Sequence, residues 1–367
     1  MSTHNENVDD EQPARRERRA LKDVSNRTVI NGSKGAKAVK AQKRTIKPIA
    51  NSNLRREVAN VKVAKSTKTS TADESKSKPD PPVDTTVAYQ YRGPPHDIDD
   101  ADADDPLCVT SYVQDMYKHY RVKEHETSVL TDYMENQPNI TSVHRSVLVD
   151  WLVEVHLQFK MVPETLYLTV NLIDRYLAKT EVQKPKLQLV GITSLLIASK
   201  YEEYQPPELR DLVHLCDKAY TKSEILDMEE VILKKLDYRI TIPSAHAFLV
   251  RFLKASHADK KIVQLSCYIL DGTLQSYNLL DYLPSQIAAA AVLIARKNAG
   301  RNAWSPTLLK YTEYREEDIL PIARKVLRAK ATASTTLRAV NDKYSKSKYG
   351  RVATIKLSLD FLSCLEF

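Results

Sequence analysis

The sequence predicts an all-α protein that consists of two tandem five-helix folds behind a disordered N-terminal tail. Only seven glycines occur in 367 residues, far below the average of about 7%, which favours helices over strands and tight turns. Residues 187–198 form a nearly continuous apolar stretch of helical length. The end of this helix, 196–200, has a counterpart at 293–297, so the chain is expected to contain two copies of one helical unit.

Residues 1–105 have the composition of a disordered, basic regulatory tail. They contain few aromatic residues and many lysines, serines and asparagines, so they cannot bury enough apolar surface to offset the entropy of ordering. Between residues 15 and 68 there are 17 lysines or arginines and three acidic residues, a net charge of +14. An acidic run at 97–105 leads into an aromatic-rich helix at 112–120, and we assign 106–141 to an N-terminal helix and a linker.

Five helices are expected in the first fold, residues 142–242. Thr141 or Ser142 can cap a helix whose apolar residues recur at three- and four-residue spacing up to Phe159. Proline or threonine marks the start of the later helices, because proline suits the first helical turn and threonine suits a cap. These helices are expected at 164–179, 186–203, 209–216 and 222–236.

The helix at 186–203 is expected to be the centre of this fold. Few polar side chains interrupt its apolar residues between 187 and 198, so apolar groups surround the helix and other helices must enclose it. Gly191 lets a neighbouring backbone come close. The run is too short to span a bilayer, which needs roughly 20 apolar residues. It ends in the charged sequence KYEE at 200–203, where the helix reaches a surface.

A second fold is expected at 243–345, after Pro243 breaks the helical pattern. Its helices are predicted at 245–255, 260–274, 284–297, 306–311 and 316–331. The charged exit of the first copy is replaced by Asn298, Ala299 and Gly300, so only the first copy keeps that feature. Residues 346–367 are assigned to a C-terminal tail.

The sequence contains no motif of a catalytic site. It has no glycine-rich phosphate loop, no His-Glu-x-x-His, no Cys-x-x-Cys and no Gly-x-Ser-x-Gly, so neither enzymatic activity nor a cofactor is expected. Four widely spaced cysteines and the lack of a signal-peptide pattern favour a reduced intracellular protein. The positive charge of 15–68 leaves −6 for all other residues, so direct binding of nucleic acid is not expected, and no membrane partner is expected either.

Four segments of the first fold closely resemble the cyclin box. They are 144–154 (HRSVLVDWLVE), 164–168 (ETLYL), 187–191 (LQLVG) and 199–203 (SKYEE). The resemblance extends from about residue 107 to residue 353, and Tyr201 together with 285–289 (SQIAA) resembles B-type, mitotic cyclins. It implies two cyclin folds in a regulatory subunit that binds and activates a mitotic cyclin-dependent kinase, controls the G2/M transition and resides in the nucleus and cytoplasm.

The resemblance also implies which residues contact the kinase. Lys200 and Glu229 match the charged residues with which cyclins hold the kinase near its mobile regulatory helix, and such a pair adds specificity more than affinity. Without the resemblance, they would be interpreted as two solvated helix ends. The apolar part of the implied interface consists of Ile197, Tyr201, Leu233, Tyr238 and Ile240. For Ile197 and Leu233 the alternative is an ordinary place in the core.

A shallow groove for Arg-x-Leu peptides of substrates or inhibitors is implied at the first helix of the box. It corresponds to Val147, Leu148, Trp151, Glu154, Leu187 and Gln188. Residues 147, 151 and 154 share a helical face, and an acid beside an apolar slot suits a ligand with a basic residue before leucine. The alternative is that Trp151 and Leu148 face the core. Arg145 and Asp174 match an ion pair that joins the first two helices of cyclins, and we assign this pair to the fold.

The tail contains an independent motif. Arg18, Leu21 and Asn26 fit a destruction box, the extended peptide by which the anaphase-promoting ubiquitin ligase recognises mitotic cyclins. A disordered tail can adopt that extended shape, so ubiquitin-dependent destruction at the end of mitosis is expected. The alternative is a solvated basic tail that is read as a nuclear address.

Two other interpretations use the same folds. A transcription-type protein would use them as a nucleic-acid or polymerase scaffold, and it would need a basic folded surface. An orphan helical scaffold without a kinase partner would require neither the pairing of Lys200 with Glu229 nor a destruction box. The matched charges and the tail motif therefore favour the kinase subunit.

Overall fold

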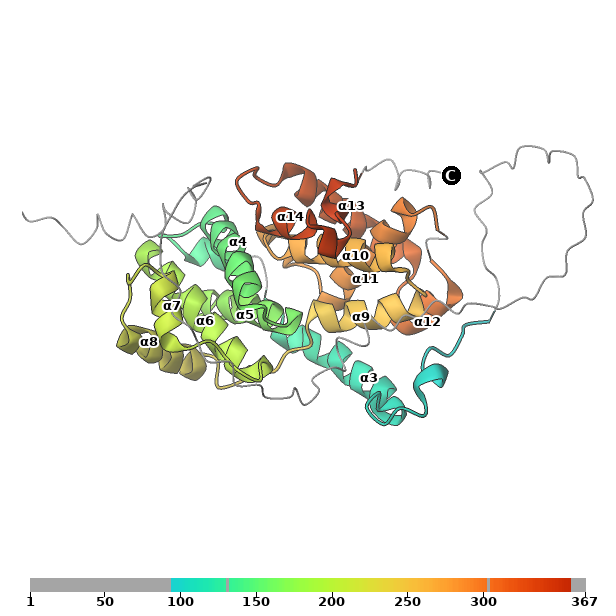
Figure 1. Cartoon of the computed structure of the whole chain (residues 1–367), viewed down its shortest axis with the longest axis horizontal. Coiled ribbons are helices and arrows are strands. Elements are labelled where there is room, and N and C mark those ends of the chain that lie inside the picture. The colour runs from blue at the N-terminus through green and yellow to red at the C-terminus, as the bar shows by residue number, and fades with distance from the viewer. Residues whose placement is uncertain (1–93, 130–131, 302–303, 358–367) are drawn as a thin grey trace, which may run out of the picture.

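The computed structural model describes residues 94–129, 132–301 and 304–357, and every regular element in these ranges is a helix. Buried side chains form two hydrophobic cores, one centred in each fold. Figure 1 shows the first fold in green and yellow on the left and the second in orange and red on the right. The prediction of an all-α protein with two tandem folds is confirmed. The tail and the destruction-box motif at Arg18, Leu21 and Asn26 lie outside the described residues.

The helices follow one another as the sequence predicts. The first fold and the helix before it comprise α3 (Thr110–Thr127), α4 (Ser142–Phe159), α5 (Pro163–Leu177), α6 (Leu187–Glu202), α7 (Leu209–Leu215) and α8 (Lys222–Lys235). The second comprises α9 (Ala245–Ala255), α10 (Lys260–Thr273), α11 (Pro284–Asn298), α12 (Pro306–Thr312), α13 (Glu316–Thr332) and α14 (Ala339–Tyr344). Short 3-10 turns are η1 (Asp100–Asp102), η2 (Tyr133–Asn136), η3 (Lys184–Lys186), η4 (Tyr277–Leu279), η5 (Ser347–Tyr349) and η6 (Val352–Thr354). Helix α3 is longer than expected and α14 was not predicted, whereas the bounds of the other helices agree within two residues.

Helix α6 is enclosed by its neighbours, as its apolar sequence requires. Every residue from Leu187 to Ser199 is buried, and the helix packs against α4, α5 and α8. At Gly191 an added Cβ would stand 2.6 Å from Leu148 Cδ1 of α4. The glycine therefore allows α4 and α6 to approach at this point, which fixes where the C-terminal end of α6 emerges.

Helix α11 has the equivalent place in the second fold. Its residues from Ile287 to Ala295 are buried, and four successive alanines at 288–291 let α9, α10 and α13 pack closely around it. At its end, Lys297 is only 12% exposed and pairs with Glu316 of α13 at 2.8 Å. The end of α11 is therefore tied into its own fold, whereas the end of α6 faces outward.

Capping residues start the helices where the sequence predicts. In α8, Thr221 Oγ1 accepts a hydrogen bond from Glu224 N at 3.2 Å, and Thr221 N donates to Glu224 Oε2 at 2.9 Å. In α4, Thr141 N donates to His144 Nδ1 at 3.1 Å. Burial, with a smaller effect of Lys184, lowers the pKa of His144, so its imidazole stays neutral and can accept this bond.

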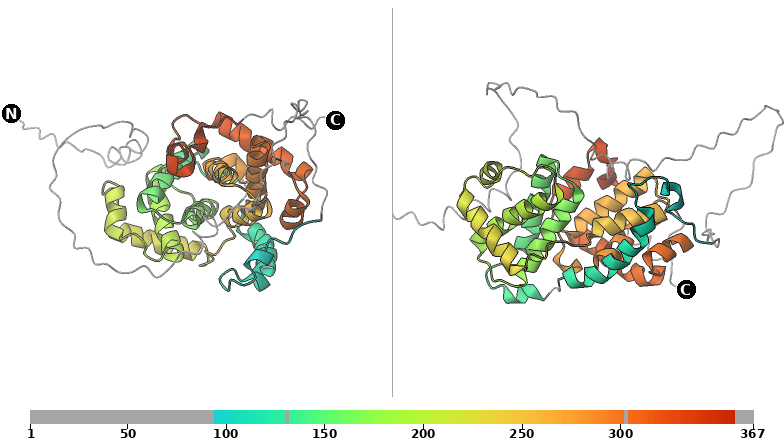
Figure 2. Two further views of the ribbon diagram at one scale, coloured as in Figure 1. Left: turned by 45° about the vertical axis from the view of Figure 1, so that its right-hand side comes forward. Right: turned by 90° about the horizontal axis from the view of Figure 1, so that it is seen from below.

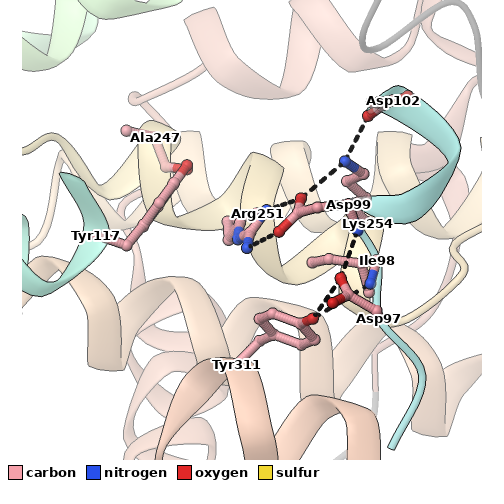
Figure 3. A network of polar contacts seen from close by, with 9 residues as sticks. All are labelled: Asp97, Ile98, Asp99, Asp102, Tyr117, Ala247, Arg251, Lys254 and Tyr311. Carbon is pink, nitrogen blue, oxygen red and sulfur yellow. Dashed lines mark hydrogen bonds and ion pairs between the residues drawn. The ribbon is translucent and has the colours of Figure 1, made fainter. Parts of the chain in front are cut away.

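Part of the acidic run that we assigned to the tail belongs to the fold. Ile98 is 4% exposed and lies in the second core. Beside it, the Asp99 carboxylate accepts hydrogen bonds from Arg251 of α9, with Nη2 to Oδ2 at 2.6 Å, and Lys254 bridges Asp99 and Asp102 (Figure 3). Complementary charge holds this segment, and the sequence could not show it because the partners are 152 residues apart.

The other expected tail also begins within the fold. Val352 is 1% exposed, and Tyr349 and Ile355 pack against the second core. Residues 346–357 therefore continue the second fold beyond α14. The turns η5 and η6 pack against α14, and η6 also packs against α10, while α14 itself contacts α4; Figure 2 shows this end of the second fold in red.

Candidate functional site

The exit of α6 carries an exposed ion pair. Lys200 Nζ lies 2.7 Å from both carboxylate oxygens of Glu229 in α8. The Lys200 side chain is 47% exposed and that of Glu229 is 14% exposed. The pair joins the outward end of α6 to the middle of α8 at the protein surface, where it is accessible to a partner. Surface pairs of this kind stabilise a fold by only about 0–1 kcal/mol.

Aromatic and aliphatic side chains surround this pair. Tyr201 is 47% exposed and Tyr238 is 63% exposed, whereas Leu233 and Ile240 are half-buried. The Tyr201 hydroxyl is hydrogen bonded to Thr241 Oγ1 at 2.6 Å, which joins α6 to the segment after α8. Of the residues predicted for a kinase interface, Lys200, Tyr201 and Tyr238 are thus exposed, whereas Leu233 and Ile240 also pack against the first core. Ile197 is 3% exposed and is part of the core.

Two exposed residues extend this surface and were missed in the sequence. Tyr204 is 87% exposed, directly after α6, and Leu226 is 43% exposed in α8. Leu226 stands three residues before Glu229 and therefore shares its helical face. An apolar residue at that spacing from a charged interface residue is the signal that would have found it. We call the set Lys200, Tyr201, Tyr204, Leu226, Glu229, Leu233, Tyr238 and Ile240 the exit surface.

The backbone after α8 is held in an uncommon conformation. Asp237 and Tyr238 both have positive φ, 53° and 55°, although neither is glycine. The Tyr238 amide nevertheless donates to Leu233 O at 2.9 Å, which closes the helix end. Non-glycine residues in this region are strained by about 1–3 kcal/mol and concentrate at functional sites. Here the turn presents the Tyr238 ring to solvent.

The charged residues that follow Lys200 do not act as one group. Glu203 Oε1 accepts hydrogen bonds from Val162 N at 2.7 Å and from Thr165 Oγ1 at 2.6 Å. It therefore satisfies donors at the start of α5. Burial, with smaller effects from nearby carboxylates, raises the pKa of Glu202. Lys200 is thus the exposed charge at the end of α6, while Glu203 stabilises the fold.

Most of the residues predicted to line the peptide groove are buried in this structure. Trp151 is 8% exposed, Leu148 and Gln188 are 2% exposed and Leu187 is fully buried. Val147 is half-buried and Glu154 is exposed. Val143, four residues before Val147 on the same helical face, is 66% exposed and was not predicted. Leu148, Trp151 and Leu187 therefore belong to the first core, as the alternative interpretation holds for Leu148 and Trp151.

One buried atom in this region has no partner. Gln188 Oε1 accepts no hydrogen bond in the described part of the chain. An unsatisfied buried acceptor is unfavourable by about 1–3 kcal/mol, so its presence calls for an explanation. Thr193 Oγ1 and Ser194 Oγ of the same helix are likewise buried without a hydrogen-bond partner in the described residues.

Arg145 and Asp174 form a buried, bidentate ion pair. Arg145 Nε lies 2.6 Å from Asp174 Oδ1, and Nη2 lies 2.7 Å from Oδ2. The Tyr133 hydroxyl donates to Asp174 at 2.8 Å, and Arg145 Nη1 donates to Leu274 O of the second fold at 2.9 Å. Burial alone would lower the pKa of Arg145, but Asp174 more than offsets it and the pKa is raised. The pair therefore joins α4, α5 and the second fold.

The junction of the two folds contains further buried charges that sequence reasoning missed. Asp271 of α10 accepts hydrogen bonds from Tyr167 of α5 at 2.7 Å, from Lys343 at 2.7 Å and from Tyr344 at 2.9 Å. These partners lie 72 to 104 residues from Asp271 in the chain, so local patterns could not indicate the contact. The folds are thus joined by ionic as well as apolar packing.

A second such contact lies between α5 and α9. His246 Nδ1 is 2.9 Å from Glu164 Oε1, and His246 is 7% exposed. Burial would lower the pKa of His246, but Cys267 and Glu164 together raise it to about 10. The imidazole is therefore protonated at neutral pH and forms an ion pair across the junction.

Within the described residues, no group of three or more histidines, cysteines or acidic residues is placed to hold a metal ion. None of the helices described is both long and apolar enough to cross a membrane.

Comparison with known proteins identifies the family. Residues 115–241 match the cyclin N-terminal domain and 243–358 match the cyclin C-terminal domain. The chain belongs to the cyclin family. The resemblance predicted from the sequence is thereby confirmed, and the boundary between the two matched domains falls just before α9.

Its relatives among curated proteins are B-type cyclins. The chain is 42% identical over 268 residues to Cyclin-B2-2 of Arabidopsis thaliana, which covers 72% of this chain and 62% of the relative. It is 40% identical over 264 residues to G2/mitotic-specific cyclin-B of Dictyostelium discoideum, which covers 71% and 61%. The match thus spans less than two thirds of the length of these relatives. An X-ray structure of a viral cyclin from herpesvirus saimiri is 21% identical with a TM-score of 0.50, over 63% of this chain and 96% of that one, and supports the fold.

Proposed function

We propose that this cyclin is the regulatory subunit of a mitotic cyclin-dependent kinase, which it binds and activates through the exit surface. The observation that supports this most is the Lys200–Glu229 pair, exposed at the end of a buried helix and surrounded by accessible Tyr201, Tyr204 and Tyr238. Exposed aromatic residues are enriched at protein interfaces. The likeness to B-type and G2/mitotic-specific cyclins favours a mitotic kinase as the partner.

The proposed mechanism is a shift of the kinase population. Binding favours the kinase state whose regulatory helix is turned inward with its catalytic ion pair formed, and the shift is limited by the difference in affinity for the two states. The sequence provides no catalytic motif, so ATP and magnesium are handled by the kinase. A partner group that approaches Lys200 and Glu229 strengthens their field by removing water, which adds specificity to the apolar contacts.

The test is the affinity of the full chain for a monomeric mitotic cyclin-dependent kinase. Lys200→Ala combined with Glu229→Ala should weaken binding by tenfold or more and leave thermal unfolding almost unchanged, because the pair is exposed. The matched control is Lys234→Ala with Glu230→Ala, an exposed lysine–glutamate pair in the same helix, whose loss should not change affinity. Equal affinity for all three proteins would contradict the proposal.

We further propose that the groove at α4 opens to admit Arg-x-Leu peptides of substrates or inhibitors. Val143, Val147 and Glu154 form its accessible entrance, and the unpartnered Gln188 Oε1 provides an acceptor inside. Glu154→Gln should slow phosphorylation of substrates that carry Arg-x-Leu more than that of substrates without it, because an acid at the entrance attracts the arginine. An equal effect on both classes would argue against docking here.

For the tail, we propose recognition by the anaphase-promoting ubiquitin ligase through Arg18, Leu21 and Asn26. The order of these residue types and their place in a segment of low apolar content support the proposal. Arg18→Ala with Leu21→Ala should lengthen the lifetime of the protein after metaphase. An unchanged lifetime would exclude this motif.

A further inference from the structure

The two folds carry opposite net charges. Residues 94–242 contain 26 acidic and 16 basic side chains, a net charge of −10, whereas 243–357 contain 8 acidic and 19 basic side chains, a net charge of +11. Within the second fold, residues 324–356 hold ten lysines or arginines and a single acid, Asp342. The net charge of −6 for all residues outside 15–68 is a sum over several segments, and it conceals the positive charge of the second fold.

Six lysines and arginines of the second fold lie on three neighbouring elements, which are α10, α13 and the segment after α14. Gln264 of α10 donates to Lys348 O at 3.3 Å, which brings this segment against the first turns of α10. One turn earlier in α10 stand Lys260 and Lys261, which are exposed. Arg351 N donates to Lys346 O at 3.3 Å and closes the loop that follows. We call Lys260, Lys261, Lys330, Lys346, Lys348 and Arg351 the basic face.

Lys330 extends the face onto α13. Its Nζ lies 3.7 Å from the ring centroid of Tyr268, four residues after Gln264 on the same side of α10. Burial lowers the pKa of Lys330 to about 8. In the described part of the chain, none of the six cations of the basic face has a carboxylate within ion-pair distance. Six cations on adjoining elements without carboxylate partners can accept an external polyanion.

The chemistry of the face favours a nucleic-acid duplex. Three elements contribute the cations, which suits a row of backbone phosphates better than a single phosphate group. Among the rings beside these cations, Tyr268 and Tyr344 are each 4% exposed and Tyr349 is partly buried, so none of the three is a fully exposed platform for the bases of a single strand. The strongly negative first fold would be repelled by a polyanion, which orients the second fold towards it.

We propose that the basic face of the second fold binds double-stranded DNA through its phosphate backbone, without dependence on base sequence. Figure 1 places α13 and α14 at the top and α8 at the lower left, so the basic face and the exit surface lie on different parts of the molecule. DNA and a kinase could therefore be bound together. The proposal does not depend on the proposed kinase function.

The test is the affinity of the full chain for a DNA duplex, measured by fluorescence anisotropy at several salt concentrations without kinase. Each phosphate contact contributes about 0.9 to the slope of log affinity against log salt. Lys346→Gln, Lys348→Gln and Arg351→Gln together should reduce the slope by about 2.7 and the affinity at 0.1 M salt by tenfold or more. These side chains are exposed, so folding should be unaffected.

The matched control neutralises three exposed lysines of the first fold, Lys160→Gln, Lys184→Gln and Lys222→Gln, which should leave affinity and slope nearly unchanged. The basic tail can also contact DNA, but it is the same in every variant. The difference in affinity and slope between the variants therefore measures the contribution of the basic face. An unchanged slope for the basic-face variant would overturn the proposal, and so would an equal loss in the control. Complete displacement of the DNA by one equivalent of a singly phosphorylated peptide would instead assign the face to a phosphate monoester.

Discussion

The substitution Gly191→Ala is expected to destabilise the first fold, because α4 leaves no room for a methyl group at this position. The added Cβ would stand 2.6 Å from Leu148 Cδ1, 3.1 Å from Cδ2 and 3.2 Å from Cγ. Leu148 is 2% exposed, so its side chain cannot turn into solvent. Either Leu148 leaves its rotamer or the two helices separate.

The magnitude follows from two opposing effects. Alanine is favoured over glycine within a helix by about 1 kcal/mol, whereas overpacking a buried site typically costs about 1–3 kcal/mol. The net effect at Gly191 is a loss of about 1 kcal/mol. At Gly272 in α10, no heavy atom lies within 4 Å of an added Cβ, so Gly272→Ala should stabilise the protein by about 0.5–1 kcal/mol.

The assay is thermal unfolding of the full chain and of these two variants, followed by circular dichroism. Their unfolding free energies should differ by about 2 kcal/mol, which corresponds to about 4–8 °C in Tm for a folded region of this size. The same chemical change should thus have opposite signs at the two sites. An increase in Tm for Gly191→Ala equal to that for Gly272→Ala would refute the close approach of α4 and α6.

Three other experiments test the buried contacts. Asp174→Asn should lower the free energy of unfolding by about 3–5 kcal/mol because Arg145 stays buried without a counter-ion. Adding Arg145→Met should restore part of this lost stability, as measured by urea unfolding. Purely additive losses in the double variant would contradict the pairing. Because its pKa is raised to about 10, His246 should stabilise the fold fully below about pH 6.5 and lose that effect as pH rises through about 10. His246→Gln should remove this part of the pH dependence of stability. Parallel profiles of unfolding free energy against pH for the variant and the unchanged protein would disprove the ion pair. Trp151→Ala should destabilise by about 3–5 kcal/mol, whereas a loss below 1 kcal/mol would show that the ring is not core.

Local patterns were sufficient for the helices and for the burial of α6. Apolar spacing, proline at the first turn of α5 and the Thr221 cap are properties of consecutive residues, so they can be identified without a fold. Apolar residues lie on all sides of α6, so they could avoid water only if other helices enclosed it, and Gly191 marked the close contact with one of them. The exposed charge at Lys200 was also evident, because it ends a run that is otherwise buried.

Contacts between distant segments could not be predicted in this way. Asp99 lies in an acidic, proline-flanked run with the composition of a solvated tail, and only the fold brings Arg251 to it. The partners of Asp271 are equally remote in sequence. The net charge of −6 summed over all residues outside 15–68 likewise hid the opposite signs of the two folds.

The groove shows a different limit of sequence reasoning. Helical spacing placed residues 147, 151 and 154 on one face of α4, but spacing does not reveal how deeply a face is buried. The depth depends on the approach of α6, whose Leu187 and Gln188 close over the same region. The exposed Val143 and the buried Trp151 therefore share a helix while one is a surface residue and the other is core.

The most direct test of the central claim is a kinase activity measurement. The purified full chain is added to a monomeric mitotic cyclin-dependent kinase, and phosphorylation of a histone-type peptide is followed together with co-migration of the two proteins in gel filtration. We predict a large increase in rate and a stable complex, both lost when Lys200 and Glu229 are replaced by alanine. No increase in rate and no co-migration would contradict the assignment as a kinase-activating subunit.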